Sequence, residues 1–296
     1  MPEGTLITVA PTGAETAKAD VPQLPTTLDE LVAEAKACEA LGAAMVHVHI
    51  RDADHHPTLD AARLRDTVQA LREQTNLIVQ LSTGGSVHDP LELRLKVLDA
   101  DPDSCSLTCG TTNFGHDVFM NPYPFMEQLY QQAQEREVVP EFELFDLGHV
   151  ASMKRLIDTY GLPFGGKVHV DFVTGVPGGM PGTTAALVAG VQALPPEVTS
   201  WSATGIGRTH LPIMAASLSL GGHLRVGMED NLVFARRVPV RDNAQLVERA
   251  ADLTRALQRP PLTTEQARSL LAIKERRRIA GAPLEQPPVK KDEVTA

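Results

Sequence analysis

The chain has 296 residues, of which 43% are hydrophobic and only 4% aromatic, and its formal net charge is −10 at pH 7. This length suits one large α/β domain with a core built from Ala, Leu and Val. The acidic balance, without a basic tract, argues against nucleic acid or an anionic membrane as the main partner. The three cysteines lack metal-finger spacing, and we find no signal segment or membrane-length apolar run, so we expect a cytoplasmic protein.

Eight short β-rich runs follow one another along the chain, and each precedes a stretch with helical periodicity. They are LITVAP from Leu6, AMVHVHI from Ala44, LIVQLS from Leu77, SCSLTC from Ser104, VPEFELF from Val139, KVHVDFV from Lys167, TSWSATGIG from Thr199 and HLRVGME from His223. Alternating strands and helices imply a parallel sheet, and eight such units closed on themselves make a TIM (β/α)8 barrel. An open doubly wound sheet is the alternative, but the first strand lacks its GxGxxG fingerprint.

Helix-boundary residues refine this prediction. Thr27 or Asp29 can cap the first long helix, and Gly42 can end it. The segment from Thr263 to Arg277 is predicted to be helical, and residues 280–296 are predicted to be a tail or an arm between subunits. Because no linker divides the core, we expect residues 1–296 to form a single catalytic barrel domain.

The second strand carries two histidines one residue apart. Side chains at positions i and i+2 of a strand point to the same face, so His47 and His49 lie side by side. Two neutral imidazoles in this arrangement can share a metal ion. Alternatively, each ring is only hydrogen-bonded within a polar patch.

Other polar residues gather where the predicted strands end, which is where TIM barrels place their active sites. Closure of the barrel puts strand eight beside strand one, so Glu229 or Asp230 can reach the histidine pair. Two histidines and a carboxylate form a three-ligand site with an open position, as expected for a catalytic zinc ion. Further residues at strand ends are Arg51, Ser82, Thr83, Gly84, Gly85, Glu141, Glu143 and Arg225.

A set of motifs extends this pattern over most of the chain. They are, in order, ITVAPTGAE, HVHIRD, LSTGG, CGTTNFG, ELFD, GVPGGMP, GIGR and GGHLRVGMEDN. With these motifs the chain resembles the β-keto acid cleavage enzyme family, and within it the 3-keto-5-aminohexanoate cleavage enzymes of lysine fermentation. The resemblance implies a zinc-containing TIM barrel that forms homotetramers. It also implies an acyltransferase that uses acetyl-CoA to split a β-keto acid into acetoacetate and a new acyl-CoA.

The resemblance assigns a role to each matching residue. It implies zinc ligands at His47, His49 and Glu229, and removal of the substrate α-proton by Arg225 and Asp230. It further implies a catalytic or substrate-binding Ser82, with Gly85 and Ser106 as substrate-binding neighbours, a supporting carboxylate at Glu143, and a substrate ammonium group held by Glu15. Thr83, next to Ser82, is a further candidate for substrate binding. Because an arginine has a pKa above about 12, we prefer Asp230 as proton acceptor, directly or through Arg225.

Plainer interpretations exist for several of these residues. Ser82 and Thr83 could cap the next helix, Glu141 and Glu143 could form a solvated or salt-bridged strand face, and Arg225 could pair structurally with Asp230. For the same-face pair His169 and Asp171 we favour structural hydrogen bonds. Arg208 follows strand seven, where barrels often bind phosphate, and is a candidate to hold a CoA phosphate.

Two other classes of protein share parts of the pattern. Metal-dependent hydrolases of the amidohydrolase type also carry HxH on a barrel strand, but on the first strand, and with a histidine or modified lysine where this chain has Glu143. A binding protein with a structural zinc ion would need neither Asp230 nor Arg225.

Glu15 is the residue that bears on the substrate. A carboxylate at the rim of a pocket favours a cationic ligand. We therefore expect a β-keto acid with an amino or quaternary ammonium group, with 3-keto-5-aminohexanoate as first choice and dehydrocarnitine as second. Alternatively, Glu15 pairs with Lys18 at the surface.

Overall fold

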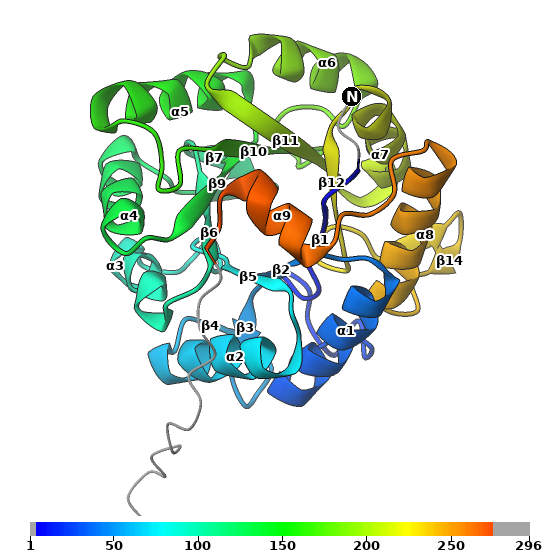
Figure 1. The fold of residues 1–296 in the computed structure, drawn as a ribbon. Helices are drawn as coiled ribbons and strands as arrows, with labels where there is room; N and C mark the ends of the chain where they lie inside the picture. The colour runs from blue at the N-terminus through cyan, green and yellow to red at the C-terminus, as the bar shows by residue number, and fades with distance from the viewer. Residues whose placement is uncertain (1–3, 275–296) are drawn as a thin grey trace, which may run out of the picture.

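The computed structural model describes residues 4–274, and its central feature is a closed barrel of parallel strands ringed by helices (Figure 1). The eight predicted runs form its eight strands, so the predicted TIM barrel is confirmed. The strands are β1 (Ile7–Val9), β2 (Met45–Val48), β5 (Ile78–Leu81), β6 (Ser104–Thr108), β9 (Val139–Leu144), β10 (Val168–Thr174), β11 (Val198–Gly205) and β12 (His223–Val226). Strand β12 pairs with β1 and closes the barrel.

Helices surround the barrel on the outside, and one further helix closes one end of it. The surrounding helices are α1 (Leu28–Leu41), α2 (Ala61–Gln74), α3 (Leu91–Leu95), α4 (Tyr123–Glu135), α5 (Leu147–Tyr160), α6 (Thr184–Ala193), α7 (His210–Ser219) and α8 (Asn243–Ala256), and the helix at the end is α9 (Thr264–Leu271). Thr27, rather than Asp29, caps α1: its hydroxyl accepts from the Glu30 amide in a capping box, and Gly42 ends the helix at φ 115°. None of the described helices is long and apolar enough to cross a membrane.

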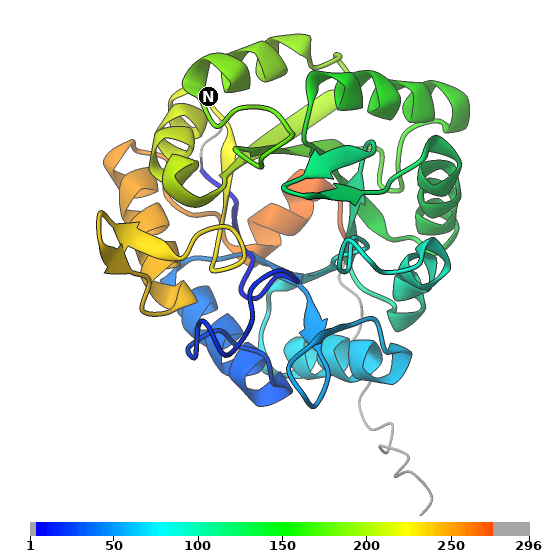
Figure 2. The same ribbon diagram turned by 180° about the vertical axis from the view of Figure 1, so that it is seen from behind.

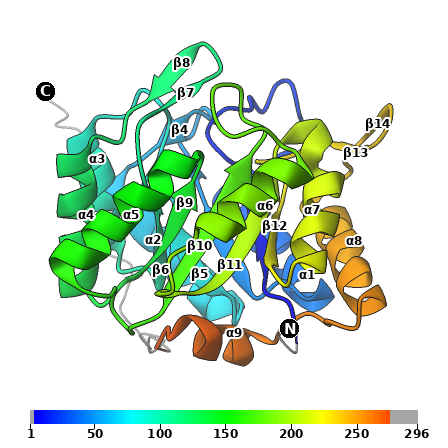
Figure 3. The same cartoon turned by 90° about the horizontal axis from the view of Figure 1, so that it is seen from above.

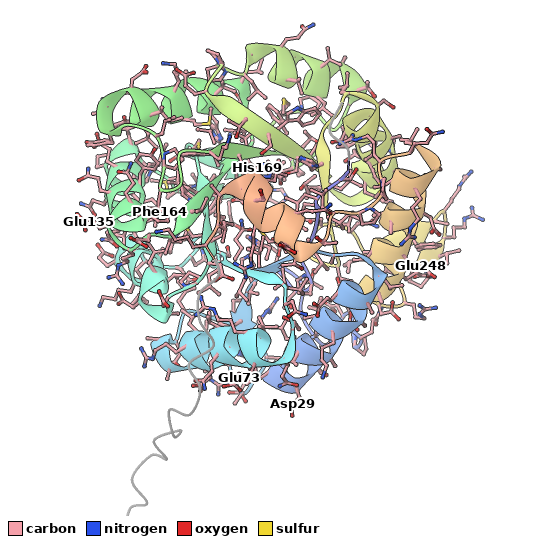
Figure 4. The ribbon with its side chains drawn as sticks, viewed as in Figure 1. Asp29, Glu73, Glu135, Phe164, His169 and Glu248 are labelled. Atoms are coloured by element: carbon pink, nitrogen blue, oxygen red, sulfur yellow. The ribbon has the colours of Figure 1, made fainter. Side chains whose placement is uncertain are left out.

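The hydrophobic core lies between the strands and the helices, whereas the barrel interior is largely polar. In β9, Phe142 belongs to the core outside the barrel and packs against Tyr130 of α4, with ring centroids 5.8 Å apart. Glu141 and Glu143 alternate with it and point the other way, because neighbouring strand residues face opposite sides. Figure 4 shows His169 near the middle of the barrel, while Glu248 lies at its outer edge.

Helix α9 lies across the amino-terminal ends of the strands, opposite the loops that carry the site residues (Figure 3). Its apolar residues Ala267 and Leu271 pack against Leu6, Met45 and Ile78. The helix begins after Thr263 as predicted but ends earlier than expected, because Ala272 adopts a left-handed conformation at φ 53°. The predicted continuation to Arg277 passes beyond residue 274, and the predicted tail at 280–296 lies outside the described residues.

Three small hairpins extend the loops at the opposite end of the barrel (Figure 2). They follow β2, β6 and β12 in the chain, and the sequence pattern did not predict them. They are β3 (Ile50–Arg51) with β4 (Pro57–Thr58), β7 (Thr112–Phe114) with β8 (Asp117–Phe119), and β13 (Val233–Ala235) with β14 (Val238–Pro239).

Candidate active site

A pocket of about 890 Å³, counted with the space open to solvent, lies at the carboxyl ends of the barrel strands. This is the position that the barrel rule predicts. Most of the predicted site residues line it, namely Glu15, His47, His49, Ser82, Gly85, Glu143, Arg225, Glu229 and Asp230. Thr83, Ser106 and Arg208 are not among its lining residues.

Three of the lining side chains form a candidate metal site. The Nε2 atoms of His47 and His49 lie 3.7 and 3.6 Å from Oε1 of Glu229, and one ligand atom from each residue falls within 4.8 Å of the others. Nitrogen and oxygen ligands lie about 2 Å from a shared zinc ion, so ligand atoms at this mutual spacing suit one ion. Glu229 Oε2 is buried without a hydrogen-bond partner, as expected for a ligand oxygen.

A chain of hydrogen bonds sets the tautomer of His47. The Ser104 hydroxyl donates to the Val139 carbonyl at 2.7 Å, so its oxygen accepts from Nε2 of Gln80 at 3.2 Å. Gln80 therefore turns Oε1 toward Nδ1 of His47, 2.6 Å away. The His47 proton must then sit on Nδ1, which leaves the Nε2 lone pair free. Burial, followed by the charge of Arg225, lowers the pKa of His47 to about 4, so its ring stays neutral and can bind a metal.

Close contact between strands β12 and β1 puts Glu229 in place. Gly227 has φ 157°, and a Cβ atom there would lie 1.9 Å from the carbonyl oxygen of Ala10. The amide of Glu229 donates to the same oxygen at 3.1 Å. On the other side, a Cβ on Gly13 would meet Cγ of Glu229 at 2.6 Å. Gly227 thus allows the close approach of the Ala10 backbone, and Gly13 leaves room for the Glu229 side chain.

Arg225 connects the candidate metal site to two further carboxylates. Its Nε and Nη2 donate to the two oxygens of Asp230 at 3.0 and 2.9 Å, and Nη1 donates to Glu143 Oε1 at 3.1 Å. Nη2 also forms an ion pair with Glu229. The structural pair with Asp230 thus exists, but it lies inside the pocket. One guanidinium faces three carboxyl groups, and a divalent cation would balance the remaining negative charge.

The two carboxyl groups beside Arg225 have shifted pKa values. Burial raises the pKa of Asp230 to about 7, with Arg225 opposing the shift and Glu229 adding to it. Burial likewise raises the pKa of Glu143 to about 7, while Arg225 and a hydrogen bond from the Thr108 hydroxyl oppose it. Carboxyl groups that titrate near neutrality suit proton transfer at a carbon acid.

The residues that follow β5 divide between the pocket and the barrel wall. The Ser82 oxygen accepts from the Gly84 amide at 3.2 Å, so its own proton remains available to a ligand. The Thr83 hydroxyl instead donates to the Ser106 carbonyl at 2.7 Å, and the Thr83 amide donates to the Ser106 hydroxyl. Neither side chain caps a helix, because α3 begins after Pro90 with no side-chain cap.

Glu15 lies at the exposed mouth of the pocket, on the loop that leaves β1. Lys18 does not pair with it: the lysine binds Glu30 at 2.8 Å, so the surface-pair alternative is wrong. Arg51 fixes the loop, because its Nη2 donates to the carbonyls of Gly13 and Thr16 at 2.7 and 3.0 Å. This positioning role was not apparent from the sequence.

An aromatic wall faces the charged part of the pocket, and sequence reasoning missed it. Phe114 and Phe119 of the β7–β8 hairpin lie with Phe145 at centroid separations of 6.1 to 6.3 Å. Val173, Val176 and Ile206 also line the pocket. The turn at Gly115, between the two hairpin phenylalanines, is the sequence signal that could have indicated this wall.

Deeper in the barrel, the remaining polar residues bind one another. His169 Nδ1 contacts the Ser200 hydroxyl at 2.7 Å and its Nε2 lies 3.2 Å from Glu141. Asp171 accepts from the hydroxyls of Ser202 and Thr204 at 2.7 and 2.6 Å. The expected structural hydrogen bonds of His169 and Asp171 are therefore confirmed. For Glu141 the solvated face is wrong, since its side chain is buried, whereas the salt-bridged alternative agrees with its contact to His169.

The comparison with known families agrees with this geometry. A model of the beta-keto acid cleavage enzyme family matches residues 5–273. The chain belongs to the β-keto acid cleavage enzyme family. The expectation of an enzyme that acts as an acyltransferase is thereby confirmed, and membership argues against the hydrolase and structural-zinc alternatives.

Relatives of this β-keto acid cleavage enzyme cover nearly its whole length. The 3-keto-5-aminohexanoate cleavage enzyme of Acetoanaerobium sticklandii is 36% identical over 273 residues, which are 92% of this chain and 99% of the relative. The 3-oxoadipate:acetyl-CoA acetyltransferase of Cupriavidus necator is 34% identical over 277 residues, 92% and 96% of the two chains. The apo structure of ObcA matches with a TM-score of 0.75 at 21% identity, over 85% of this chain and 66% of that chain, which supports the fold alone.

Proposed function

We propose that this enzyme is zinc-dependent and converts an amino-bearing β-keto acid and acetyl-CoA into acetoacetate and a new acyl-CoA. One observation carries the proposal: the ligand atoms of His47, His49 and Glu229 converge in a pocket whose mouth holds the acidic Glu15. The proposed first substrate is 3-keto-5-aminohexanoate, which would give the enzyme a role in lysine degradation.

The overall reaction transfers a two-carbon carboxymethyl unit. The substrate R–CO–CH2–COO⁻ loses a proton from the carbon between its carbonyl groups, and that carbon attacks the acetyl carbonyl of acetyl-CoA. The released thiolate attacks the former ketone carbon, and the carbon–carbon bond breaks to leave acetoacetate and R–CO–SCoA. The carbon released by this cleavage takes back the proton that was removed in the first step, and the thiolate and the acyl group recombine, so atoms and charge balance without a further co-reactant.

The metal ion and the side chains of the pocket would perform different parts of this reaction. Zinc held by His47, His49 and Glu229 would supply a Lewis acid for the substrate oxygens. Asp230 accepts the α-proton, and Arg225 orients its carboxylate through two hydrogen bonds. The Ser82 hydroxyl, whose proton is not used within the loop, can donate to a developing oxyanion.

Charge at the pocket mouth supports an amino-bearing substrate. Lys18 is bound to Glu30, so the Glu15 carboxylate can pair with the substrate cation. The nearby Arg51 donates from Nη1 and Nη2 to backbone carbonyls, although its charge still acts on Glu15. A substrate ammonium group near Glu15 therefore adds an interaction that a neutral tail cannot make.

Dehydrocarnitine is the second candidate substrate, and the aromatic wall favours it. Phenylalanine rings attract quaternary ammonium groups through their π faces, and Phe114, Phe119 and Phe145 cluster on one side of the pocket. The same rings also accommodate the methyl end of 3-keto-5-aminohexanoate. Glu15 suits either cation.

The family resemblance supports three further parts of the proposal. We propose that residues 1–296 act as one catalytic domain, that the enzyme forms a homotetramer, and that it works in the cytoplasm. Sedimentation of the purified protein tests the tetramer directly.

The deciding experiment incubates purified, zinc-loaded protein with acetyl-CoA and a panel of β-keto acids that carry amino, trimethylammonium, methyl or carboxylate tails. Acetoacetate and the matching acyl-CoA should appear in equal amounts, most rapidly for a cationic tail. Omission of acetyl-CoA is the control, because simple decarboxylation needs no thioester. Absence of acetoacetate with every substrate would refute the proposed activity, whereas preference for a neutral tail would refute only the proposed substrate.

A further inference from the structure

Four arginines lie on three neighbouring elements at the rim of the barrel, on the side of β11 and β12. Arg208 belongs to the short turn Gly207–Thr209 that follows β11, Arg236 and Arg237 form the tip of the β13–β14 hairpin, and Arg249 lies on α8. From their placement we propose that this arginine cluster binds the phosphate groups of CoA. The inference rests on the proposed use of acetyl-CoA and adds a nucleotide subsite to it.

Arg249 brings the three elements together. Its Nη1 donates to the carbonyl of Phe234 on the hairpin at 2.6 Å, and its guanidinium lies 4.2 Å from the centre of the Phe234 ring. Its Nη2 lies 2.8 Å from Nε2 of His210, the first residue of α7. Arg236 is two residues after Phe234 and Arg208 two residues before His210, so both are anchored close to Arg249.

The cluster adjoins the catalytic pocket. The amide of Gly207 donates to the carbonyl of Asp230 at 2.8 Å, and Ile206 lines the pocket directly. A smaller cavity behind Asp230 is lined by both His210 and Arg249. A thioester in the pocket can therefore extend past Ile206 toward the arginines, with its nucleotide end outside.

The charge of the cluster stands out in this acidic protein. The net charge of the chain is −10, yet within residues 4–274 none of these four arginines forms a salt bridge with a carboxylate. The carboxylates of the adjacent β12 loop, Glu229 and Asp230, are engaged by Arg225, and the neighbouring Glu248 of α8 is exposed. Asp252, also exposed on α8, is bound by Arg255. Four guanidinium groups outnumber these carboxylates and leave a local positive surface.

The chemistry of CoA fits such a surface. Its nucleotide end carries a diphosphate and a 3′-phosphate, and guanidinium groups bind phosphate oxygens in a bidentate manner. The loops after strands seven and eight are also where TIM barrels often hold phosphate. Val233 and Val238, with 45% and 46% of their surfaces exposed, flank the hairpin tip and offer an apolar surface to an adenine base.

The test compares acetyl-CoA with acetyl-pantetheine, which has the same thioester but no nucleotide. In the Arg236→Ala/Arg237→Ala double variant and in Arg208→Ala, we expect the KM for acetyl-CoA to rise about tenfold or more, as for loss of a charged hydrogen bond. The KM for acetyl-pantetheine and the KM for the β-keto acid should not change. Binding of 3′,5′-ADP by calorimetry should weaken in parallel. Arg65→Ala, an exposed arginine on α2, is the matched control.

Three results separate the possible failures. An equal rise in both thioester KM values, or unchanged 3′,5′-ADP binding, would overturn the phosphate site. A double variant that sediments as a smaller species and still binds 3′,5′-ADP normally would overturn it too, and would identify the hairpin as a subunit contact. If the wild type makes no acetoacetate yet binds 3′,5′-ADP through these arginines, the proposed activity fails and the phosphate site survives.

Discussion

The Nδ1 atom of His47 lies 2.6 Å from Oε1 of Gln80, and this contact decides which ring nitrogen can face Glu229. Gln80 cannot reverse its amide without placing an NH2 group against the His47 N–H and losing its bond to Ser104. All three side chains are buried, so water cannot replace the lost partners. Residues that hold the second nitrogen of a metal-bound histidine in this way raise the affinity of the site for its metal.

We therefore predict that Gln80→Leu weakens zinc binding about 10- to 100-fold, because the Nδ1 proton of His47 loses its acceptor. Gln80→Glu keeps an acceptor and should retain most of the affinity. Competition against a fluorescent zinc chelator measures both. Gln128→Leu, on the exposed face of α4, is the control. Equal zinc affinity in Gln80→Leu and the wild type would contradict the argument.

A second prediction concerns the metal itself. Wild-type protein should bind one zinc ion per chain, and the His47→Ala/His49→Ala double variant should bind none, because only Glu229 remains of the three ligands. Chelation should abolish acetoacetate formation and leave the circular dichroism spectrum unchanged, since the core lies outside the barrel. His56→Ala removes an exposed histidine as a control. Full zinc occupancy in the double variant would place the metal elsewhere.

The barrel and most of the pocket could be predicted from the sequence because each signal is local. Buried parallel strands are short apolar runs, and polar residues at their ends share one face of the barrel once the order of strands is known. His47, His49 and Glu229 meet for this reason, although Glu229 is 180 residues away from His49 in the chain. The motif resemblance added the roles of Ser82 and Glu143, which spacing alone could not assign.

What the sequence did not reveal depends on contacts between distant segments. Phe114 and Phe119 join the pocket only because a hairpin folds over the barrel end, and short exposed hairpins carry no core pattern. Arg51 binds backbone carbonyls, which every residue possesses, so no residue type indicates its partners. Gln80 is recognisable in the sequence as a polar residue within a buried strand. Its contact with His47 became evident only from the register between β2 and β5, which pairs the two residues.

A third prediction tests the close approach of β12 and β1. Gly227→Ala should lower the free energy of unfolding by about 1 to 3 kcal/mol, because the new Cβ would overlap the Ala10 carbonyl oxygen and the strands must shift. It should also weaken zinc binding, since Glu229 bonds to the same carbonyl. Gly148→Ala, at the start of α5 and free of such overlap, should be neutral or slightly stabilising. Denaturant unfolding and zinc titration measure the two effects, and an unaffected Gly227→Ala protein would contradict the argument.

A fourth prediction assigns the base. Asp230→Asn should reduce exchange of the substrate α-proton with deuterated solvent by about a hundred- to ten-thousandfold, because the amide cannot accept that proton. Zinc content should stay at the wild-type level, since Asp230 is not one of the three clustered ligands. Asp66→Asn, exposed on α2, controls for the change of charge. An unchanged exchange rate in Asp230→Asn would remove the residue from the proton-transfer step.

The last prediction concerns the choice of substrate at the pocket mouth. Glu15→Gln keeps the size of the side chain and removes its charge, so it should lower kcat/KM for a substrate with an amino tail about tenfold, as expected for one charge-assisted hydrogen bond. For the methyl analogue of that substrate, kcat/KM should stay the same, because no cation is present to lose an interaction. Glu30→Gln tests the neighbouring carboxylate that binds Lys18 and should leave the preference unchanged. If Glu15→Gln lowers kcat/KM equally for both substrates, Glu15 shapes the loop rather than binds the ammonium group, and the cationic-substrate proposal fails.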